Sequence, residues 1–250
     1  MLSDLLSGCH KWIEAVASLV YPEICQVCKE ERATPVQGYV GRECRSKVHP
    51  IQPPFCMRCG LPFPGEIGME FECSNCTNVP LHFTYARSAV PAKDVVLDVI
   101  HRYKYQRALW FEPFLVELFL EAALPALKSD RWNLIVPVPL HPSRQNEREF
   151  NQAEHLAHSL GKAIGIDVNN RALIRIQATP TQTHLTREER ARNVRNAFAM
   201  RKRADVRGAR IIVVDDVLTT GATTNACART LRKAGAEEVC VWTVARGMAS

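Results

Sequence analysis

The sequence has no apolar run of the roughly 20 residues that a membrane-spanning helix requires. Its first 20 residues also lack a basic start, and Asp4, Lys11 and Glu14 interrupt their apolar side chains. A secretory signal peptide would have both a basic start and an unbroken apolar stretch. These absences argue against a membrane-spanning or exported protein and predict a cytoplasmic location. In that reducing environment, paired cysteines bind metal more often than they form disulfides.

Cysteine is nearly absent from the later part of the chain. Of the ten cysteines, only Cys227 and Cys240 lie beyond residue 76. Two earlier pairs, Cys56-x-x-Cys59 and Cys73-x-x-Cys76, are separated by 13 residues, and this spacing lets four thiolates surround one tetrahedral zinc ion. A module this short has little apolar core, so bound zinc would supply much of its folding free energy.

One cysteine is missing from a second set of the same kind. Cys25-x-x-Cys28 is a complete pair, but Gly41 stands three residues before Cys44, where the partner pair would begin. This site is either incomplete, or His49 or another ligand completes it. The predicted zinc ligands are therefore Cys25, Cys28, Cys44, Cys56, Cys59, Cys73 and Cys76.

Acidic residues are scarce in one segment. Residues 171–210 hold 11 Lys or Arg residues against three Asp or Glu residues, whereas residues 1–80 hold seven against nine. The net charge of +6 is therefore local, and it indicates an anionic partner such as phosphate, pyrophosphate or nucleic acid. A solvated basic face without such a partner is the alternative.

The run Ile211-Ile212-Val213-Val214 is apolar without alternation, which predicts a strand covered on both faces in a parallel α/β sheet. Asp215 and Asp216 follow at the carboxyl edge, where such sheets bind ligands. Next come residues 219–223, rich in threonine, and then a predicted helix over residues 225–234.

This order of residues suits a phosphorylated sugar. The carboxylates of Asp215 and Asp216 can accept hydrogen bonds from two sugar hydroxyls. Gly221 lets the backbone come close to an anion, while N–H groups at the helix start and threonine hydroxyls can donate to phosphate oxygens. The alternative is an ordinary strand-to-helix turn in which the threonines are caps and the carboxylates are solvated.

Periodicity and proline positions predict further elements. We expect helices over residues 2–20, 95–103, 111–127 and 151–164, a strand over residues 134–140, and a domain boundary near residue 80. Bases alternate with aromatic side chains in residues 101–107, which predicts either single-stranded nucleic acid binding or a helix end with Tyr103 in the core. Residues 179–184 predict a loop, and residues 186–195 an arginine-rich helix that would either close over pyrophosphate or bind nucleic acid.

Residues 211–223 resemble the phosphoribosyl pyrophosphate (PRPP) loop of type I phosphoribosyltransferases. The resemblance implies an α/β fold with a type I phosphoribosyltransferase-like parallel sheet, Mg²⁺ bound with PRPP, and catalytic Asp215 and Asp216 that hold the ribose hydroxyls. By the same resemblance, Arg144, in the loop after residues 134–140, would contact the pyrophosphate. The implied 5-phosphate site consists of Thr219, Thr220, Gly221, Ala222 and Thr223.

Several stretches together carry a wider resemblance: the cysteine pairs, Tyr103-Lys104-Tyr105, Val136 to Pro142, Phe150 to Glu154, Gln182 to Asn196, and residues 211–223. With them, the chain as a whole resembles the ComF family, also described as double zinc ribbon or GntX-like proteins with a phosphoribosyltransferase domain. Gly41 and Glu149 depart from the family pattern, in which a cysteine and a glycine are usual. The resemblance implies an N-terminal helix and zinc-ribbon module in residues 1–80 and a phosphoribosyltransferase-like domain in residues 81–250.

The family is linked to natural transformation, in which imported single-stranded DNA is handled with a helicase and recombination proteins. We therefore expect a PRPP-binding protein that acts with single-stranded DNA in DNA uptake. The alternative is an active, Mg²⁺-dependent phosphoribosyltransferase of nucleobase or nucleotide metabolism. We favour it less because we find no residues dedicated to recognising a base. A third hypothesis is a zinc-ribbon scaffold whose PRPP loop is vestigial.

Overall fold

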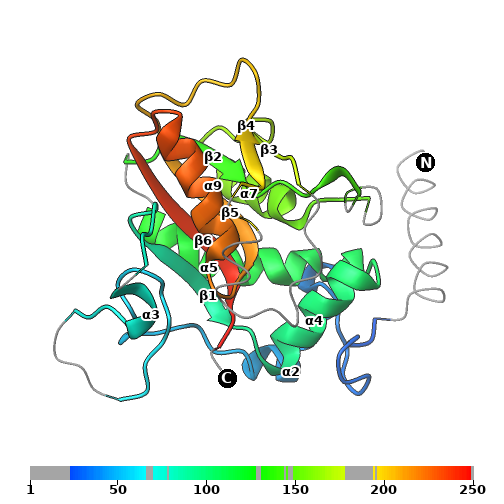
Figure 1. The fold of residues 1–250 in the computed structure, drawn as a ribbon. Helices are drawn as coiled ribbons and strands as arrows, with labels where there is room; N and C mark the ends of the chain where they lie inside the picture. The colour runs from blue at the N-terminus through cyan, green and yellow to red at the C-terminus, as the bar shows by residue number, and fades with distance from the viewer. Residues whose placement is uncertain are drawn as a thin grey trace, which may run out of the picture.

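The computed structural model describes residues 23–65, 70–77, 79–127, 131–143, 145, 149–177, 194 and 196–248 (Figure 1). The helix predicted over residues 2–20 lies outside these ranges, as do Arg144 and nearly all of the segment 179–195. Among the helices of the described residues, none has the length and apolar character needed to cross a membrane.

Four parallel strands form the central sheet of the described chain. Their order is β1 (Ala86–Pro91), β6 (Glu238–Arg246), β5 (Arg210–Leu218) and β2 (Leu134–Pro137). The apolar run of residues 211–214 lies in β5 and pairs with a strand on each side. The prediction of a parallel α/β sheet is therefore confirmed.

Helices cover both faces of this sheet. They are α4 (Asp94–Tyr105), α5 (Glu112–Leu127), α7 (Gln152–Ile164) and α9 (Ala222–Lys233). Ile212 and Val214 of β5 pack into a cluster with α4, α5 and α7, whereas Ile211 and Val213 pack with α9. Successive residues of a strand face opposite sides of a sheet, and all four side chains are fully buried. Figure 1 shows α9 on the near side of the sheet and α5 behind it.

Most elements begin and end close to their predicted positions. Asn151 caps α7 because its side-chain oxygen accepts a hydrogen bond from the N–H of Ala153 at 3.1 Å. Gly165 ends α7 in the left-handed conformation. α9 begins at Ala222, three residues before its predicted start. β2 ends earlier than predicted, since Pro139 has no N–H to continue the ladder.

Residues 23–77, which we call the cysteine-rich module, contain little regular structure where they are described. Their elements are η1 (Pro35–Gln37), α2 (Arg42–Ser46) and α3 (Ser74–Thr77). The module packs on the edge strand β1: the N–H of Ile51 donates to the Ala89 carbonyl at 2.9 Å, and the N–H of Ala86 donates to the Arg58 carbonyl at 2.7 Å. The domain boundary near residue 80 stays a prediction.

Three short elements complete the described fold. η2 (Leu109–Phe111) precedes α5, and β3 (Leu173–Arg175) pairs with β4 (Phe198–Met200) in a separate antiparallel sheet. Phe198 and Leu173 pack in the cluster on the α9 side of the central sheet. This placement brings Arg175, at the end of β3, toward the carboxyl end of β5.

Candidate ligand-binding loop and metal centres

The loop between β5 and α9, residues 219–221, is held by its own hydrogen bonds. Gly221 has a φ of 76° and a ψ of 3°, a left-handed conformation that residues with a side chain disfavour. Its carbonyl accepts from the N–H of Asn225 at 2.8 Å and from the hydroxyl of Thr224 at 3.1 Å. The N–H of Ala222 lies 3.4 Å from Thr220 Oγ1. The start of α9 therefore presents N–H groups and threonine hydroxyls, which suit an anion.

Asp215 and Asp216 lie inside β5, because the strand continues beyond its apolar run to Leu218. Side chains alternate along a strand, so the two carboxylates leave opposite faces of the sheet. Asp216 faces α4, where its Oδ2 lies 2.7 Å from Lys104 Nζ. Asp215 lies on the α9 side, near Arg175 and Cys227. Both carboxylates thus lie near the carboxyl end of the strand, as predicted, but they have different neighbours on opposite faces of the sheet.

The surroundings of Asp215 change its acidity. Burial and the adjacent Asp216 carboxylate raise the pKa of Asp215 to about 7, although the charges of Lys104 and Arg175 oppose the shift. The N–H of Asp216 also donates to Asp215 Oδ1 at 2.9 Å. Near neutral pH this carboxyl is therefore partly protonated, and a bound cation would favour its ionised form. Groups perturbed in this way occur most often at functional sites.

Lys104 is a site residue that the sequence analysis did not assign. Lys104 belongs to the stretch of basic and aromatic residues 101–107, in which some side chains are buried and others are exposed. Tyr103 is buried and its hydroxyl donates to Glu112 Oε2 at 3.1 Å, whereas Tyr105 is exposed. The side chain of Lys104 is 17% exposed and that of Asp216 is 14% exposed. This largely buried ion pair joins residues far apart in the chain, so no local pattern predicts it.

Arg246, at the end of β6, is a second residue that the sequence analysis missed, and it joins the β5–α9 loop to the cysteine-rich module. It is buried, and its Nη1 donates to the carbonyls of Leu218 at 2.8 Å, Thr219 at 2.5 Å and Gly247 at 2.7 Å. Its Nε donates to the Cys59 carbonyl at 3.2 Å, and its Nη2 to Cys59 Sγ at 3.6 Å. One buried cation therefore holds both the loop and a predicted zinc ligand.

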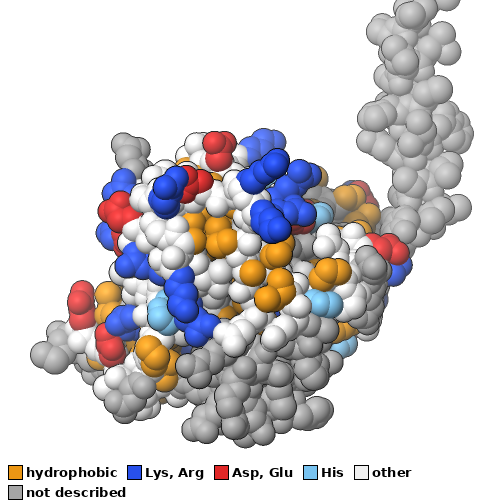
Figure 2. Space-filling model, turned by 45° about the horizontal axis from the view of Figure 1, so that its top comes forward, with side chains coloured by type: hydrophobic (Ala, Val, Ile, Leu, Met, Phe, Trp, Pro, Cys, Tyr) orange, Lys and Arg blue, Asp and Glu red, His pale blue; other side chains and the backbone are white. Residues whose placement is uncertain are grey.

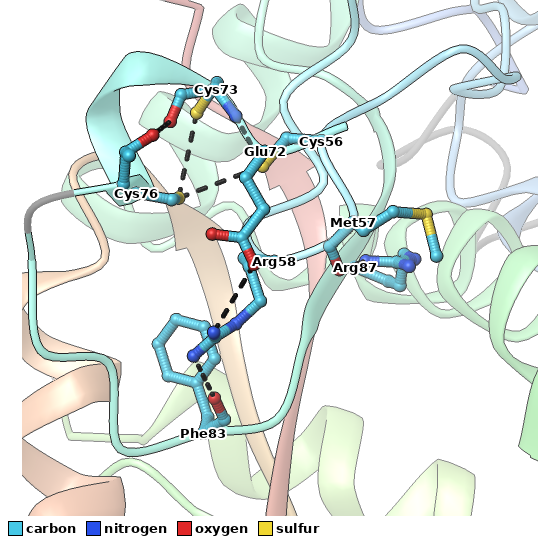
Figure 3. Close-up of polar contacts among 9 residues, drawn as sticks. Cys56, Met57, Arg58, Glu72, Cys73, Cys76, Phe83 and Arg87 are labelled. Carbon is cyan, nitrogen blue, oxygen red and sulfur yellow. Dashed lines mark hydrogen bonds and ion pairs between the residues drawn. The ribbon is translucent and has the colours of Figure 1, made fainter. Parts of the chain in front are cut away.

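The second cysteine group, which consists of Cys56, Cys59, Cys73 and Cys76, brings four sulfur atoms together. The Sγ–Sγ distances are 3.8 Å for Cys56–Cys76 and 3.7 Å for both Cys59–Cys73 and Cys73–Cys76. Figure 3 shows Cys56, Cys73 and Cys76 turned toward one another. Sulfurs about 2.3 Å from a tetrahedral zinc ion lie about 3.8 Å apart. The group therefore fits one zinc ion.

Hydrogen bonds to Cys59 and Cys56 favour the thiolate form of these two members of the group. The Cys76 thiol and the Arg246 guanidinium both donate to Cys59, and they hold the pKa of its thiol well below the usual range. The N–H of Cys73 donates to Cys56 Sγ at 3.3 Å. Zinc binds the thiolate and not the thiol, so donors to sulfur favour the form that zinc requires.

The first cysteine group, which consists of Cys25, Cys28 and Cys44, also converges. A carboxylate oxygen of Glu31 lies among its three sulfur atoms, and all four atoms are within 4.8 Å of one another. His49, one of the alternatives for a fourth ligand, is described but is not part of this group. Glu31 was not assigned from the sequence because it follows Cys28 closely and does not have the spacing of a second cysteine pair.

The predicted pyrophosphate loop and arginine-rich helix are described only in part. Arg144 and residues 186–193 lie outside the described residues. Earlier in the same loop, within the described residues, His141 Nδ1 and Ser143 Oγ are 2.8 Å apart. Of the basic segment 171–210, the exposed cations in the described residues are Arg171, Arg201, Lys202, Arg203 and Arg207. Figure 2 shows a face on which Lys and Arg side chains outnumber the carboxylates between them.

Comparisons with known proteins match two domain families. Residues 16–77 match the double zinc ribbon domain, and residues 153–250 match the phosphoribosyl transferase domain. The first match includes both cysteine groups. The second includes β5, the β5–α9 loop and α9, and it agrees with the parallel order of the strands.

Two known proteins are similar over most of the chain. Competence protein F of Haemophilus influenzae is 31% identical over 217 residues, which cover 81% of this chain and 95% of that protein. DNA utilization protein YhgH of Salmonella typhimurium is 31% identical over 234 residues, which cover 91% of this chain and 99% of that protein.

Solved structures overlap with about half of the chain. Purine phosphoribosyltransferase from Pyrococcus horikoshii is 18% identical over 53% of this chain and 83% of that one, with a TM-score of 0.33. The allosteric regulatory enzyme of purine biosynthesis is 23% identical over 51% of this chain, with a TM-score of 0.32, and the chain covers only 24% of that enzyme. TM-scores of 0.33 and 0.32 are too low to support a fold assignment. The assignment depends instead on the order of the parallel strands and on the match to the phosphoribosyl transferase domain.

Proposed function

This chain belongs to the ComF family, and from that premise we propose that it binds PRPP, or a related phosphoribosyl ligand, together with Mg²⁺ at the β5–α9 loop. One observation carries the proposal: Asp215 and Asp216 lie near the carboxyl end of β5, and the short loop that follows leads through the left-handed Gly221 into the N-terminus of α9. A phosphorylated sugar needs acceptors for its hydroxyls and donors for its phosphate, side by side. The two carboxylates and the helix start offer this combination.

The 5-phosphate would lie against residues 219–223. The N–H groups of the first turn of α9 have no earlier helical carbonyl to bond, and that of Ala222 makes only a long contact of 3.4 Å with Thr220 Oγ1, so phosphate oxygens can accept from them. The hydroxyls of Thr219, Thr220 and Thr223 add further donors. Gly221 has no side chain to keep a phosphate away from this backbone.

The ribose hydroxyls would donate to Asp215 and Asp216. Because Asp216 already binds Lys104 at 2.7 Å, the sugar must share or replace that ion pair. Arg144 is the proposed partner of the pyrophosphate group. Mg²⁺, when bound with the ligand, would neutralise pyrophosphate charge.

The phosphate subsite can be tested with Gly221→Ala and calorimetric titration of ribose 5-phosphate. A Cβ at Gly221 would have free space, since its nearest neighbours lie 3.8 Å away, but its φ of 76° would be strained. Gly208→Ala is a matched control, with a φ of 67° and nothing within 4 Å of the added Cβ. We expect Gly221→Ala to weaken binding about tenfold and Gly208→Ala to leave it unchanged. Equal affinities in the two variants would contradict the assignment.

We further propose that the protein acts with single-stranded DNA in DNA uptake in the cytoplasm, where a helicase and recombination proteins would be its partners. The names of the two relatives, which refer to competence and DNA utilization, support this proposal. The exposed neighbours Arg201, Lys202 and Arg203 provide adjacent cations for a phosphate backbone.

Fluorescence anisotropy of a labelled oligonucleotide across a salt series tests DNA binding. Affinity should fall steeply with salt, and changing Arg201, Lys202 and Arg203 together to Gln should reduce the slope by about 2. A matched triple variant, Arg32→Gln, Arg131→Gln and Lys162→Gln, changes the same charge at three separated, exposed positions and should leave the slope nearer to wild type. Absence of binding at low salt, or binding that ignores salt, would refute the DNA proposal.

A second candidate function is an active Mg²⁺-dependent phosphoribosyltransferase. The pKa of about 7 at Asp215 favours it, because a carboxyl that titrates near neutral pH can exchange a proton during a reaction. Pyrophosphate release from PRPP in the presence of a panel of nucleobases is the test. Acceptor-dependent release would establish the enzyme, whereas PRPP binding without release would favour the binding function. Normal transformation with Asp215→Asn and Asp216→Asn would instead favour the vestigial loop.

A further inference from the structure

The first cysteine group supplies three thiolates, one fewer than a closed tetrahedral zinc site requires. We propose that the carboxylate of Glu31 is the fourth ligand, so that Cys25, Cys28, Glu31 and Cys44 form a Cys₃Glu zinc site. Carboxylate oxygens bind zinc at about 2.0–2.2 Å. The double zinc ribbon match does not supply this ligand, because residue 41 is glycine.

Gly41 is the counterpart of Cys73 in the second group. The N–H of Gly41 donates to Cys25 Sγ at 3.3 Å, and the N–H of Cys73 donates to Cys56 Sγ at the same distance. Each residue also stands three positions before the last cysteine of its group. The first group therefore lacks the ligand that Cys73 supplies in the second.

Glu31 occupies the space that a side chain at position 41 would use. A Cβ built on Gly41 would lie 2.1 Å from Glu31 Cδ and 2.5 Å from Glu31 Oε2. The backbone of Gly41 is extended, with a φ of −75°, which any residue can adopt. Glycine is therefore required here by the carboxylate beside it and not by the backbone conformation. A cysteine side chain at position 41 and the Glu31 carboxylate would therefore occupy the same space.

Two backbone donors fix the direction of the carboxylate. The N–H of Glu43 donates to Glu31 Oε2 at 2.8 Å, and the N–H of Cys44 donates to Glu31 Oε1 at 3.0 Å. Oε1 lies 3.7 Å from Cys28 Sγ. An oxygen and a sulfur bound to one tetrahedral zinc ion would be about 3.5 Å apart, as the usual bond lengths require. A small movement of either side chain would place both atoms at bonding distance from one zinc ion.

The competing explanation is that Glu31 only caps α2, because the two backbone donors belong to the first turn of that helix. Glu31→Gln separates the two roles. An amide oxygen can still accept hydrogen bonds from N–H groups, but it carries no charge to offset that of a zinc ion. The Cys₃Glu site has the same formal ligand charge as the Cys₄ site of the second group, and Glu31→Gln reduces it by one.

Zinc content of the full-length protein, purified under reducing conditions and dialysed against a moderate chelator, tests the proposal. We expect two zinc ions per wild-type chain, one for each group. Glu31→Gln and Glu31→Ala should retain one. Glu31→Ala combined with Gly41→Cys should retain two, because the smaller side chain makes room for a fourth thiolate. Glu30→Gln, which changes an exposed neighbour, is the matched control and should retain two.

Cobalt substitution gives an independent readout, because the sulfur-to-cobalt charge-transfer absorption increases with each thiolate ligand. The double variant Glu31→Ala with Gly41→Cys should absorb more strongly than wild type, having eight thiolates in place of seven. A single zinc ion in the wild-type protein would overturn the proposal. It would also be overturned if Glu31→Gln kept two zinc ions with the affinity and cobalt spectrum of wild type, or if the double variant kept only one.

Discussion

In the central sheet, large apolar side chains such as Phe119, Ile212 and Leu231 are fully buried on the two faces. In the cysteine-rich module, the cluster around the second cysteine group has only Cys56, Cys59 and Cys76 as its buried members. Apolar burial stabilises the sheet, and Ala33, Val40 and Val48 of the module pack in the same cluster as α4 and α5. The part of the module around the second cysteine group has little such area and depends on metal ligands. The two regions should therefore respond differently to chelators, to pH and to ligand.

Two arginines connect the sheet and its helices to the cysteine-rich module. Arg246 belongs to the sheet, but it donates hydrogen bonds to Cys59 in the module and to the start of the β5–α9 loop. Arg45 makes a second connection at the surface, through Glu117 and Glu121 of α5. Arg246 therefore contacts both the proposed ligand loop and a predicted zinc ligand, whereas the ion pairs of Arg45 involve neither.

Zinc removal from the second cysteine group should have the largest effect and should separate the two regions. Structural zinc sites contribute about 10–16 kcal/mol of apparent binding free energy, which exceeds any stability that the small module could have alone. Cys56→Ser should therefore unfold much of residues 55–77 while β5 and β6 stay protected, as measured by hydrogen exchange with mass spectrometry. Cys227→Ala, a buried cysteine outside both groups, should leave exchange in the module unchanged. Protection of the module after zinc loss would contradict this comparison.

Arg246→Met should have the next largest effect, because it removes the buried connection between the regions. Hydrogen bonds from a charged donor contribute about 1.5–3 kcal/mol, and this change also leaves buried carbonyls unpaired. We expect the free energy of unfolding to fall by about 3 kcal/mol, together with faster zinc release and weaker binding of the phosphoribosyl ligand. Arg45→Met should cost less than about 1 kcal/mol, since its ion pairs are partly exposed. Chemical denaturation of both variants measures the difference, and equal losses would refute it.

Asp215→Asn should have a smaller effect, confined to the sheet and dependent on pH. The folded pKa of Asp215, about 7, lies above its unfolded value. The folded protein therefore binds more protons between about pH 4 and 7, and stability falls as pH rises through that window. Asp215→Asn should raise the free energy of unfolding by about 1–2 kcal/mol above pH 7 and change it little at pH 4, while ligand binding is lost. Asp98→Asn, at an exposed position, should show no such pH dependence. An Asp215→Asn effect that is constant with pH would contradict the account.

Sequence periodicity predicted the sheet better than the site. An unbroken apolar run such as residues 211–214 has few physical solutions other than a strand covered on both faces, and the capping residues of α7 act locally. The carboxylates of Asp215 and Asp216 and the cysteines of both groups were also found from local spacing. Lys104, Arg246 and Glu31 were missed because their partners are set by tertiary packing, which places a side chain beside groups with no fixed sequence separation.

Titration of PRPP with Mg²⁺ into the zinc-loaded, full-length protein is the measurement that tests the proposed phosphoribosyl site most directly. Calorimetry should detect binding to wild type and a loss of about 100-fold or more in the variant with Asp215→Asn and Asp216→Asn, because two hydrogen bonds to charged acceptors are removed. Asp98→Asn with Glu121→Gln changes the same charge at exposed positions and should bind as wild type does. Failure of the wild-type protein to bind PRPP, or equal affinity in the Asp215 and Asp216 variant, would contradict the site.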